Sequence, residues 1–366
     1  MNRTICVLCH SSTFSNIYTL HNYPITPSSS SLDISSDEFN DCIFVSCNFC
    51  GAVQLKNLID PFKLYKDSHN STEETPTWKK HHELFANFIS ATTYTSSILE
   101  VGGNSGILYK FLNNNISDYT ILDICNSGDR PSDIKFIEGN CETFDFSGHS
   151  TIVLSHTLEH LYSPIKFIDN LSKGGVESIY ISIPNMEHLY DSKNISIIHN
   201  EHTFFIGDNE IRYLFSQHGF SCEAFYEFKK HSLFYKFIHD PSIIPLPLYK
   251  NMERSAHIQS YLNDFEKSIA KVVIDKPCFI CPAGHYGQKI YYYLREYSKN
   301  IIGFIDNDIS KQNKRVYGTS VYVYSPDTLL NYKDTEINVI LYAGPYTTEL
   351  KSQLNIVHSD IEYIVV

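Results

Sequence analysis

The sequence lacks any apolar stretch of the roughly 20 residues that a membrane-spanning helix needs, so we do not expect a membrane protein. The first residues, MNRTICVLCHSS, lack the apolar core of a signal peptide, and we therefore expect a cytoplasmic location. The chain also lacks a basic run and has a net charge of −12, which argues against nucleic acid as a partner. Charged residues are few, at 19%, but aromatic residues reach 14%, so 366 residues should fold into two or three packed domains.

Cysteine is the next feature, because ten cysteines in a reducing compartment are not expected to form disulfides. Two CxxC pairs stand near the N-terminus: Cys6, Cys9, Cys47 and Cys50. Two such turns can complete a tetrahedron of thiolates around Zn²⁺ and leave no open position for catalysis. The alternative is four unrelated cysteines. We predict a structural zinc module over residues 1–60, with Gly51 easing the second turn and the Ser-rich segment between the pairs forming a loop.

A third pair, Cys278 and Cys281, lies in the apolar run CFIC. On a strand these two side chains point to opposite faces, so we expect core cysteines and not metal ligands. The text that follows reads as strand, turn and helix, and two more apolar strands come after it. We predict a Rossmann-like α/β domain over residues 271–366, with nucleotide binding and a purely architectural role both open. Residues 226–270 are predicted to be a connector that contains a helix.

The central part of the chain contains a glycine-rich turn after an apolar strand, SSILEVGGNSGILYKFL. Its notable residues are Glu100, Gly102, Gly103 and Gly106. Glycines let the backbone approach a ligand closely, and a following helix would offer free N–H groups. Taken alone, this pattern also fits dinucleotide binding. Asp123 ends the next predicted strand, 118–124, where a carboxylate can accept hydrogen bonds from both hydroxyls of a ribose.

Three more apolar segments, 134–140, 150–156 and 178–185, alternate with segments that we expect to form helices. This alternation predicts an open, mostly parallel sheet over residues 61–225, with its ligand at the carboxyl ends of the strands. Asn140, Ser155 and His156 stand at two of these ends.

The run from strand 96–101 through SHTLEHLYSP resembles the class I S-adenosylmethionine (SAM) methyltransferases, whose fold is a doubly wound α/β sheet. The ordered set CVLC, CNFCGAVQL, EVGGNSG, HNEH and CPAGHYGQKI further resembles the zinc-containing sugar C-methyltransferases. This resemblance implies SAM and structural Zn²⁺ as cofactors. It also implies a nucleoside-diphosphate-linked keto-deoxysugar as the small-molecule partner. The residues expected at the cofactor are Glu100, Gly102, Gly103, Gly106, Asp123, Asn140, Ser155 and His156.

The loop HNEH carries the chemistry that the resemblance implies. C-methylation beside a ketone needs a base for the α-proton and a donor for the enolate oxygen. His202 matches the family's base and Glu201 the acid before it, whereas His199 replaces a family tyrosine and is expected near the oxyanion. His160 is a second candidate, either catalytic or shaping the pocket.

Two alternatives remain open at this stage: O- or N-methylation of a sugar or other metabolite, and a binding protein that has lost turnover. Tyr65 fits the family's active-site tyrosine segment, and the text from His69 to His82 forms either a lid or an exposed loop and helix start. The sequence does not indicate an oligomeric state.

Overall fold

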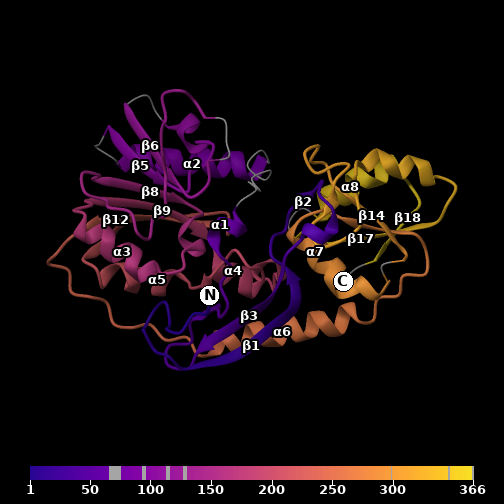
Figure 1. Ribbon diagram of the computed structural model, residues 1–366, viewed down its shortest axis with the longest axis horizontal. Helices are drawn as coiled ribbons and strands as arrows, with labels where there is room; N and C mark the ends of the chain where they lie inside the picture. Colours follow the sequence, from indigo (N-terminus) through magenta and orange to yellow (C-terminus); the bar gives the residue numbers. More distant parts are fainter. Residues whose placement is uncertain are drawn as a thin grey trace. The chain divides into compact units, whose positions relative to one another are not determined.

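The computed structural model describes residues 1–65, 76–92, 96–112, 116–126, 130–297, 299–344 and 347–364 (Figure 1). The chain forms two compact units. The first contains Met1–Ile17, Ile43–Ser192 and Glu201–Ser255, and the second contains Tyr18–Cys42, Lys193–Asn200 and Ala256–Val366.

A seven-stranded sheet forms the centre of the first unit, with the order β11-β12-β9-β8-β5-β6-β7. Its strands are β5 (Ser97–Val101), β6 (Asp118–Asp123), β7 (Lys135–Glu138), β8 (Thr151–Ser155), β9 (Ser178–Pro184), β11 (Phe220–Phe228) and β12 (Ser232–His239). The five strands from β7 to β9 are parallel, and β12 runs antiparallel to both of its neighbours. The chain order reverses between β5 and β8, the place where open α/β sheets bind ligands. The class I methyltransferase fold predicted from the sequence is confirmed.

Helices cover both faces of this sheet because successive strand residues point to opposite sides. On one face α2 (Pro76–Thr92) packs Phe85 and Ile89 against Ile98 and Val153. On the other face α3 (Pro164–Lys173) and α5 (Asp208–Ser216) pack against the alternate strand residues, such as Leu99 (Figure 1). The two buried layers hold the carboxyl edge of the sheet in place.

The elements at that edge differ from the expected ones. The turn after β5 leads into a 3-10 helix, η3 (Leu108–Phe111), and not into an α-helix. After β8 comes another 3-10 helix, η4 (Leu158–His160), which precedes α3. The predicted boundary at residue 225 is wrong, because β11 and β12 complete the sheet as far as His239. The helix expected in the connector is present as α6 (Glu253–Ile269).

A second sheet has the order β1-β3-β4-β10. Its strands are β1 (Phe14–Pro24), β3 (Phe39–Cys47), β4 (Val53–Leu55) and β10 (Phe204–Phe205). The division into units falls inside β1 and β3, so residues 1–60 do not form the separate module that we predicted. Two short helices of the first unit are α1 (Pro61–Leu64) and α4 (Met186–Asp191).

The second unit contains a five-stranded parallel sheet, with the order β16-β14-β13-β17-β18. Its elements are β13 (Cys278–Cys281), α7 (His285–Leu294), η6 (Arg295–Tyr297), β14 (Ile301–Ile305), β16 (Val323–Tyr324), η7 (Pro326–Tyr332), β17 (Ile337–Leu341), α8 (Thr347–Val357) and β18 (Ile361–Ile364). An α/β domain is therefore present where the Rossmann-like domain was predicted. Cys278 and Cys281 are both buried in β13, as expected of core residues.

The Ser-rich segment between the cysteine pairs is not a free loop. It contains η1 (Ile34–Ser36) and the strand β2 (Ser29–Ser30), which pairs with β15 (Arg315–Val316) in the second unit. The Arg315 guanidinium donates two hydrogen bonds to the buried Asp37 carboxylate, one of them 2.7 Å long. It also donates to the carbonyl oxygens of Leu32 and Asp33. A short helix of the same unit, η5 (Ile195–Ile197), precedes the HNEH loop.

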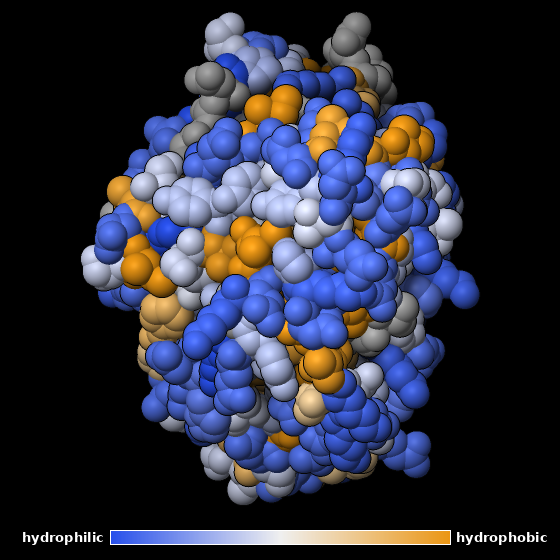
Figure 2. All heavy atoms as spheres, turned by 90° about the vertical axis from the view of Figure 1, so that its right-hand side faces the viewer, coloured by the Kyte–Doolittle hydropathy of each residue, from blue (hydrophilic) through white to orange (hydrophobic). Residues whose placement is uncertain are grey.

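The surface is mixed in character. On the face drawn in Figure 2, hydrophobic side chains occur in separate groups among hydrophilic ones. A substantial apolar share is normal for folded domains, because polar groups cannot cover a whole protein surface. Within the described ranges, no helix has the length and apolarity required to cross a membrane.

Candidate functional site

Four cysteines from two turns of the first unit converge. Cys6 Sγ lies 3.6 Å from Cys50 Sγ, and Cys9 Sγ lies 3.5 Å from Cys47 Sγ. All four sulfur atoms lie within 4.8 Å of one another, and three of the four residues are buried. Tetrahedral Zn²⁺ with Zn–S bonds of about 2.3 Å places its sulfur ligands about 3.8 Å apart. The grouping predicted from the sequence is confirmed, and its spacing fits a tetrahedral metal.

Gly51 follows the second cysteine pair in the left-handed region, with φ +80°. A Cβ atom there would collide with the Asn251 carbonyl oxygen, and the Asn251 amide donates a 3.0 Å bond to the Cys50 carbonyl. Glycine is thus required here both by the backbone conformation of the turn and by the nearby segment around Asn251.

The glycine-rich turn after β5 is closely packed from behind. Gly102 has φ +76°, and a Cβ there would lie 2.5 Å from Thr157 Oγ1. A Cβ on Gly103 would collide with the Glu100 carboxylate, which is buried and accepts a 2.7 Å bond from the Tyr119 hydroxyl. Glu100 therefore supports the turn from inside the fold.

Asp123 ends β6 beside this turn. Its Oδ2 accepts a 3.0 Å bond from the Asn104 amide, and its Oδ1 accepts a 3.1 Å bond from the Cys125 amide. Burial raises the pKa of this carboxyl group, whereas the amide bonds oppose the shift. Gly106 completes the turn with φ +71°. The predicted turn and the predicted acceptor thus lie together at the carboxyl edge.

The other expected cofactor residues follow the next strands. Asn140 comes after β7, where its side chain accepts a 2.9 Å bond from the Glu142 amide and stabilises its own turn. Ser155 ends β8, and its Oγ is buried without a hydrogen-bond partner among the described residues. His156 follows, and its Nε2 lies 2.9 Å from Ser232 Oγ.

Tyr65 and His160 form a hydrogen-bonded pair at this edge. The Tyr65 hydroxyl lies 2.7 Å from His160 Nδ1. Tyr65 directly follows α1, which Asp60 caps by accepting a 2.9 Å bond from the Phe62 amide. The short capped helix therefore sets the position of the tyrosine. Burial raises the pKa of Tyr65 well above its usual value, and the charges of Glu201, Glu159 and Asp123 contribute.

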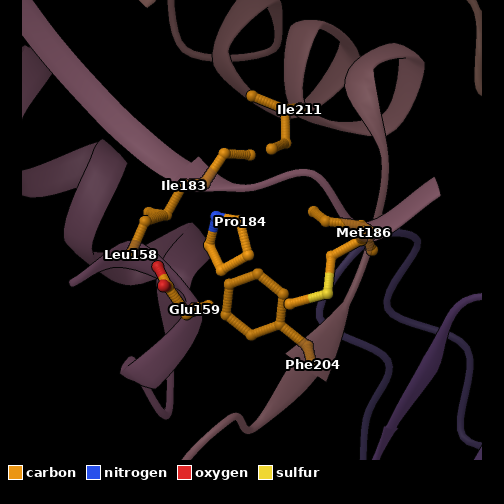
Figure 3. A pocket seen from close by; sticks show the side chains of 8 residues that line it. Leu158, Glu159, Ile183, Pro184, Met186, Phe204 and Ile211 are labelled. Carbon is orange, nitrogen blue, oxygen red and sulfur yellow. The ribbon is translucent and has the colours of Figure 1, made fainter. Parts of the chain in front are cut away.

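Glu159 is a buried carboxyl group between two histidines. Its Oε1 lies 3.4 Å from His156 Nδ1 and 3.9 Å from His202 Nε2. Figure 3 shows Glu159 among apolar side chains that line a small cavity of about 10 Å³, including Ile183 and Phe204. Burial raises the pKa of Glu159 to about 7, and the nearby His160 opposes this shift.

The chain around His202 is tied to η4. The Thr203 amide donates a 2.9 Å bond to the Glu159 carbonyl, and the Leu55 amide donates a 2.9 Å bond to the Thr203 carbonyl. The His202 and His160 rings meet edge to face with centroids 5.0 Å apart. Ligand atoms of Glu159, His160 and His202 lie within 4.8 Å of one another, so this group could also hold a metal ion.

His199 is grouped differently. It belongs to the second unit, where its ring lies 4.5 Å from that of His285 on α7. Glu201 and His202 belong to the first unit. The set of His199, Glu201 and His202 that the sequence spacing indicates therefore stays a prediction.

A further cluster, not predicted as a functional group, lies on the same edge. We call it the histidine–tryptophan cluster; its members are Trp78, His81, His82, His156 and His231. The Trp78 ring centroid lies 4.7 Å from that of His156 and 5.1 Å from those of His81 and His231. Burial lowers the pKa of all four histidines, to about 4 for His82 and His231.

The sequence WKKHH, from Trp78 to His82, was a visible signal for this cluster, but it did not show that His231 joins it. His69 and Asn70, which we also considered for a lid, lie outside the described residues.

No protein-family model and no curated protein matches this sequence. Among solved structures, the methyltransferase domain of bacterial CtHen1 is similar at 15% identity and a TM-score of 0.38, over 45% of this chain and 99% of its own. N-methyltransferase NodS from Bradyrhizobium japonicum WM9 is similar at 13% identity and a TM-score of 0.35, over 46% and 99%. The CurJ carbon methyltransferase is similar at 12% identity and a TM-score of 0.36, over 50% and 61%. At these identities the likeness concerns the fold alone.

Proposed function

We propose that this chain is a SAM-dependent C-methyltransferase that acts on a nucleoside-diphosphate-linked keto-deoxysugar. The observation that carries the proposal is the position of Tyr65. Its hydroxyl lies 2.7 Å from His160 Nδ1, and the nearby charges of Glu201, Glu159 and Asp123 add to burial in raising its pKa. A proton-transfer group and a candidate cofactor carboxylate therefore share one edge of the sheet.

The residues at this edge fit SAM. Asp123 presents a half-buried carboxylate that can accept hydrogen bonds from both ribose hydroxyls. The turn requires glycine at positions 102 and 103, because a Cβ would collide with Thr157 or with the Glu100 carboxylate. When bound, SAM would supply an electrophilic methyl group on its sulfonium.

His202 is the proposed general base. It takes the proton from the carbon next to the ketone, and the electrons of the broken C–H bond move to the ketone oxygen as an enolate. The Glu159 carboxyl group, 3.9 Å from His202 Nε2, stabilises the imidazolium when ionised. SAM held at Gly102, Gly103 and Asp123 would supply the methyl group: the bond from the enolate carbon would form as the methyl–sulfur bond breaks, its electron pair would stay on sulfur, and S-adenosylhomocysteine would leave.

Tyr65 is the proposed donor to the enolate oxygen. Its raised pKa keeps the hydroxyl protonated at neutral pH, and His160 orients it through the 2.7 Å hydrogen bond. We propose Tyr65 for the oxyanion role expected of His199, because the Tyr65–His160 hydrogen bond lies within the first unit. Glu201 is buried near Tyr65 and contributes negative charge there.

The four-cysteine group is proposed to hold a structural Zn²⁺. Its sulfur spacing fits the ion, and with four thiolate ligands no coordination position is left for a substrate. The second cysteine turn is bonded to Asn251, so the metal would stabilise the first unit without taking part in the reaction.

A direct test is to incubate the protein with SAM and a panel of nucleotide-linked keto-sugars in D₂O. The expected product is heavier by one methylene, and deuterium should enter the carbon next to the ketone. His202→Asn should lower both methyl transfer and deuterium uptake by about 10²–10⁴-fold with SAM affinity almost unchanged. His21→Asn is the matched control, because the His21 side chain is 75% exposed.

Each other outcome has a clear meaning. Normal turnover in His202→Asn together with its loss in His160→Asn would move the base to His160. Methyl transfer without deuterium uptake would favour the O- or N-methylation alternative. Loss of activity after chelation in a protein that keeps its four-cysteine zinc would point to a metal at Glu159, His160 and His202.

A further inference from the structure

The histidine–tryptophan cluster contains buried polar atoms that lack a partner. His82 is 5% exposed, and neither of its ring nitrogens has a hydrogen-bond partner within the described part of the chain. The same holds for Nδ1 of His81, which is 0% exposed, and for the buried Oγ of Ser155. Leaving a buried polar group unsatisfied costs about 1–3 kcal/mol, so a group of them in one place requires an explanation.

Ser155 belongs to a row of small residues at the carboxyl edge, and His81 contacts the same row. Val101 is paired with Leu154, and one residue further along Ser155 is paired with Ser182, so Gly102, Ser155 and Ser182 form a row across β5, β8 and β9. His81 Nε2 lies 2.7 Å from Ser182 Oγ. Ser155 is therefore next to the glycine-rich turn, and His81 contacts the neighbouring strand in the same row.

A second contact links the cluster to that turn. The His82 ring stacks on the ring of Phe111, with centroids 6.3 Å apart and an interplanar angle of 21°. Phe111 belongs to η3, the helix that directly follows the turn. His82 is thus held between α2 and the segment that leaves the proposed cofactor site.

The chemistry of the set is that of neutral donors and acceptors. Burial lowers the pKa of His82 to about 4, so at neutral pH its imidazole carries one N–H donor and one lone pair. His81 offers one further nitrogen, and the Ser155 hydroxyl can donate and accept. A ligand that satisfies all of them must both accept and donate hydrogen bonds, as the carboxylate and ammonium of an α-amino acid do.

We propose that His82, His81 and Ser155 bind the α-amino-acid end of SAM. This proposal rests on the proposed cofactor, and it assigns the two ends of that molecule to different residues. The ribose is held by Asp123 at the end of β6, and the amino acid is held over the row of small residues on the other side of the Gly102 turn. The ring of Trp78, the chain's one tryptophan, lies 5.8 Å from that of His82, so its fluorescence reports on this place.

The test compares two ligands that differ only at the amino-acid end. S-adenosylhomocysteine carries that end, whereas 5′-methylthioadenosine has the same nucleoside without it. Binding of both is measured by calorimetry and by Trp78 fluorescence, with no turnover required. His82→Phe keeps an aromatic ring against Phe111 but removes both nitrogens, and Ser155→Ala is a milder second variant.

We expect His82→Phe to weaken S-adenosylhomocysteine binding by on the order of 10- to 100-fold and to leave 5′-methylthioadenosine binding within about 2-fold. Ser155→Ala should show the same selectivity with a smaller loss. Asp123→Ala is the matched control and should weaken both ligands. The fluorescence change should be larger with S-adenosylhomocysteine.

Three results would overturn the inference. The first is unchanged S-adenosylhomocysteine affinity in both His82→Phe and Ser155→Ala. That result would mean that the cluster does not bind the cofactor and would favour the sugar substrate as its ligand. The second is an equal loss for both ligands, which would mean that the cluster only supports the fold. The third is a wild-type protein that binds neither ligand, and in that case the proposed cofactor fails together with the inference.

Discussion

The four histidines of the histidine–tryptophan cluster should make the first unit sensitive to acid. Each has a folded-state pKa below the ordinary 6.5, and those of His82 and His231 are about 4. In the unfolded chain each returns to about 6.5, so the unfolded state binds more protons than the folded state below that pH. The stability that these groups confer when neutral is present above pH 6.5 and is lost as the pH falls from 6.5 towards 4.

The size of the effect can be worked out for pH 5. A histidine that stays neutral in the folded state lowers the free energy of unfolding by about 1.4 kcal/mol for each pH unit below 6.5. At pH 5 this is about 2 kcal/mol for each histidine and about 8 kcal/mol for all four. Glu159 acts in the opposite direction, because its folded pKa is about 7 against an ordinary 4.5. Its proton uptake stabilises the fold by about 3 kcal/mol at pH 5. The net loss of about 5 kcal/mol is comparable to the whole stability of many domains.

Urea unfolding at pH 7, 6 and 5 measures this loss directly. The slope of the unfolding free energy against pH should correspond to a net uptake of about three protons on unfolding near pH 5.5. On unfolding, each of the four histidines gains a proton and Glu159 releases one. His82→Phe should reduce the slope by about one proton. His21→Asn, a change at a 75% exposed side chain, should leave the slope unchanged. Equal stability at pH 5 and pH 7, or an unaltered slope in His82→Phe, would refute the reasoning.

Three further expectations concern other parts of the chain. Cys6→Ser should remove one equivalent of zinc from the purified protein and lower its melting temperature, and metal analysis that finds no zinc in the wild type would contradict the zinc proposal. Asp37→Ala should destabilise the second unit by about 3–5 kcal/mol in urea unfolding, because it leaves the 6% exposed Arg315 side chain without its carboxylate; a loss below about 1 kcal/mol would show that water replaces the pair. Lys289 is buried and donates to two carbonyl oxygens around η5, just before the HNEH loop. Lys289→Met should therefore lower kcat while the affinity for S-adenosylhomocysteine stays unchanged. An equal loss of kcat and of this affinity would indicate general unfolding.

Much of the first unit's sheet was predictable because its central strands β5, β6, β8 and β9 are buried on both faces, whereas β7 lies at the edge and is partly exposed. Parallel strands in that position read as continuous apolar runs, and the expected strands at 118–124, 134–140, 150–156 and 178–185 correspond to β6, β7, β8 and β9. Asp123 could be placed because a side chain at a strand end lies at the sheet edge whatever its neighbours are. The cysteine grouping was predictable for a similar reason, since a CxxC turn is local.

The errors concern partners that are distant in the sequence. The segment between the cysteine pairs is polar, but nothing in it shows that β2 pairs with β15 or that Asp37 meets Arg315. Likewise, β12 contains mixed aromatic and polar residues, and only its pairing with β9 shows that it belongs to the sheet and not to a connector.

The sequence alone determined the residue types at the carboxyl edge, because glycines, a strand-end acid and closely spaced histidines are local patterns with local physical reasons. Only the tertiary structure decided which of them act together. Tyr65 meets His160 across 95 positions, and His81 meets Ser182 across 101. Burial, which raises the pKa of Glu159 and lowers those of the clustered histidines, is likewise a property of the packed chain. Such contacts depend on how helices and loops close over the sheet, and no spacing of residues along the chain encodes them directly.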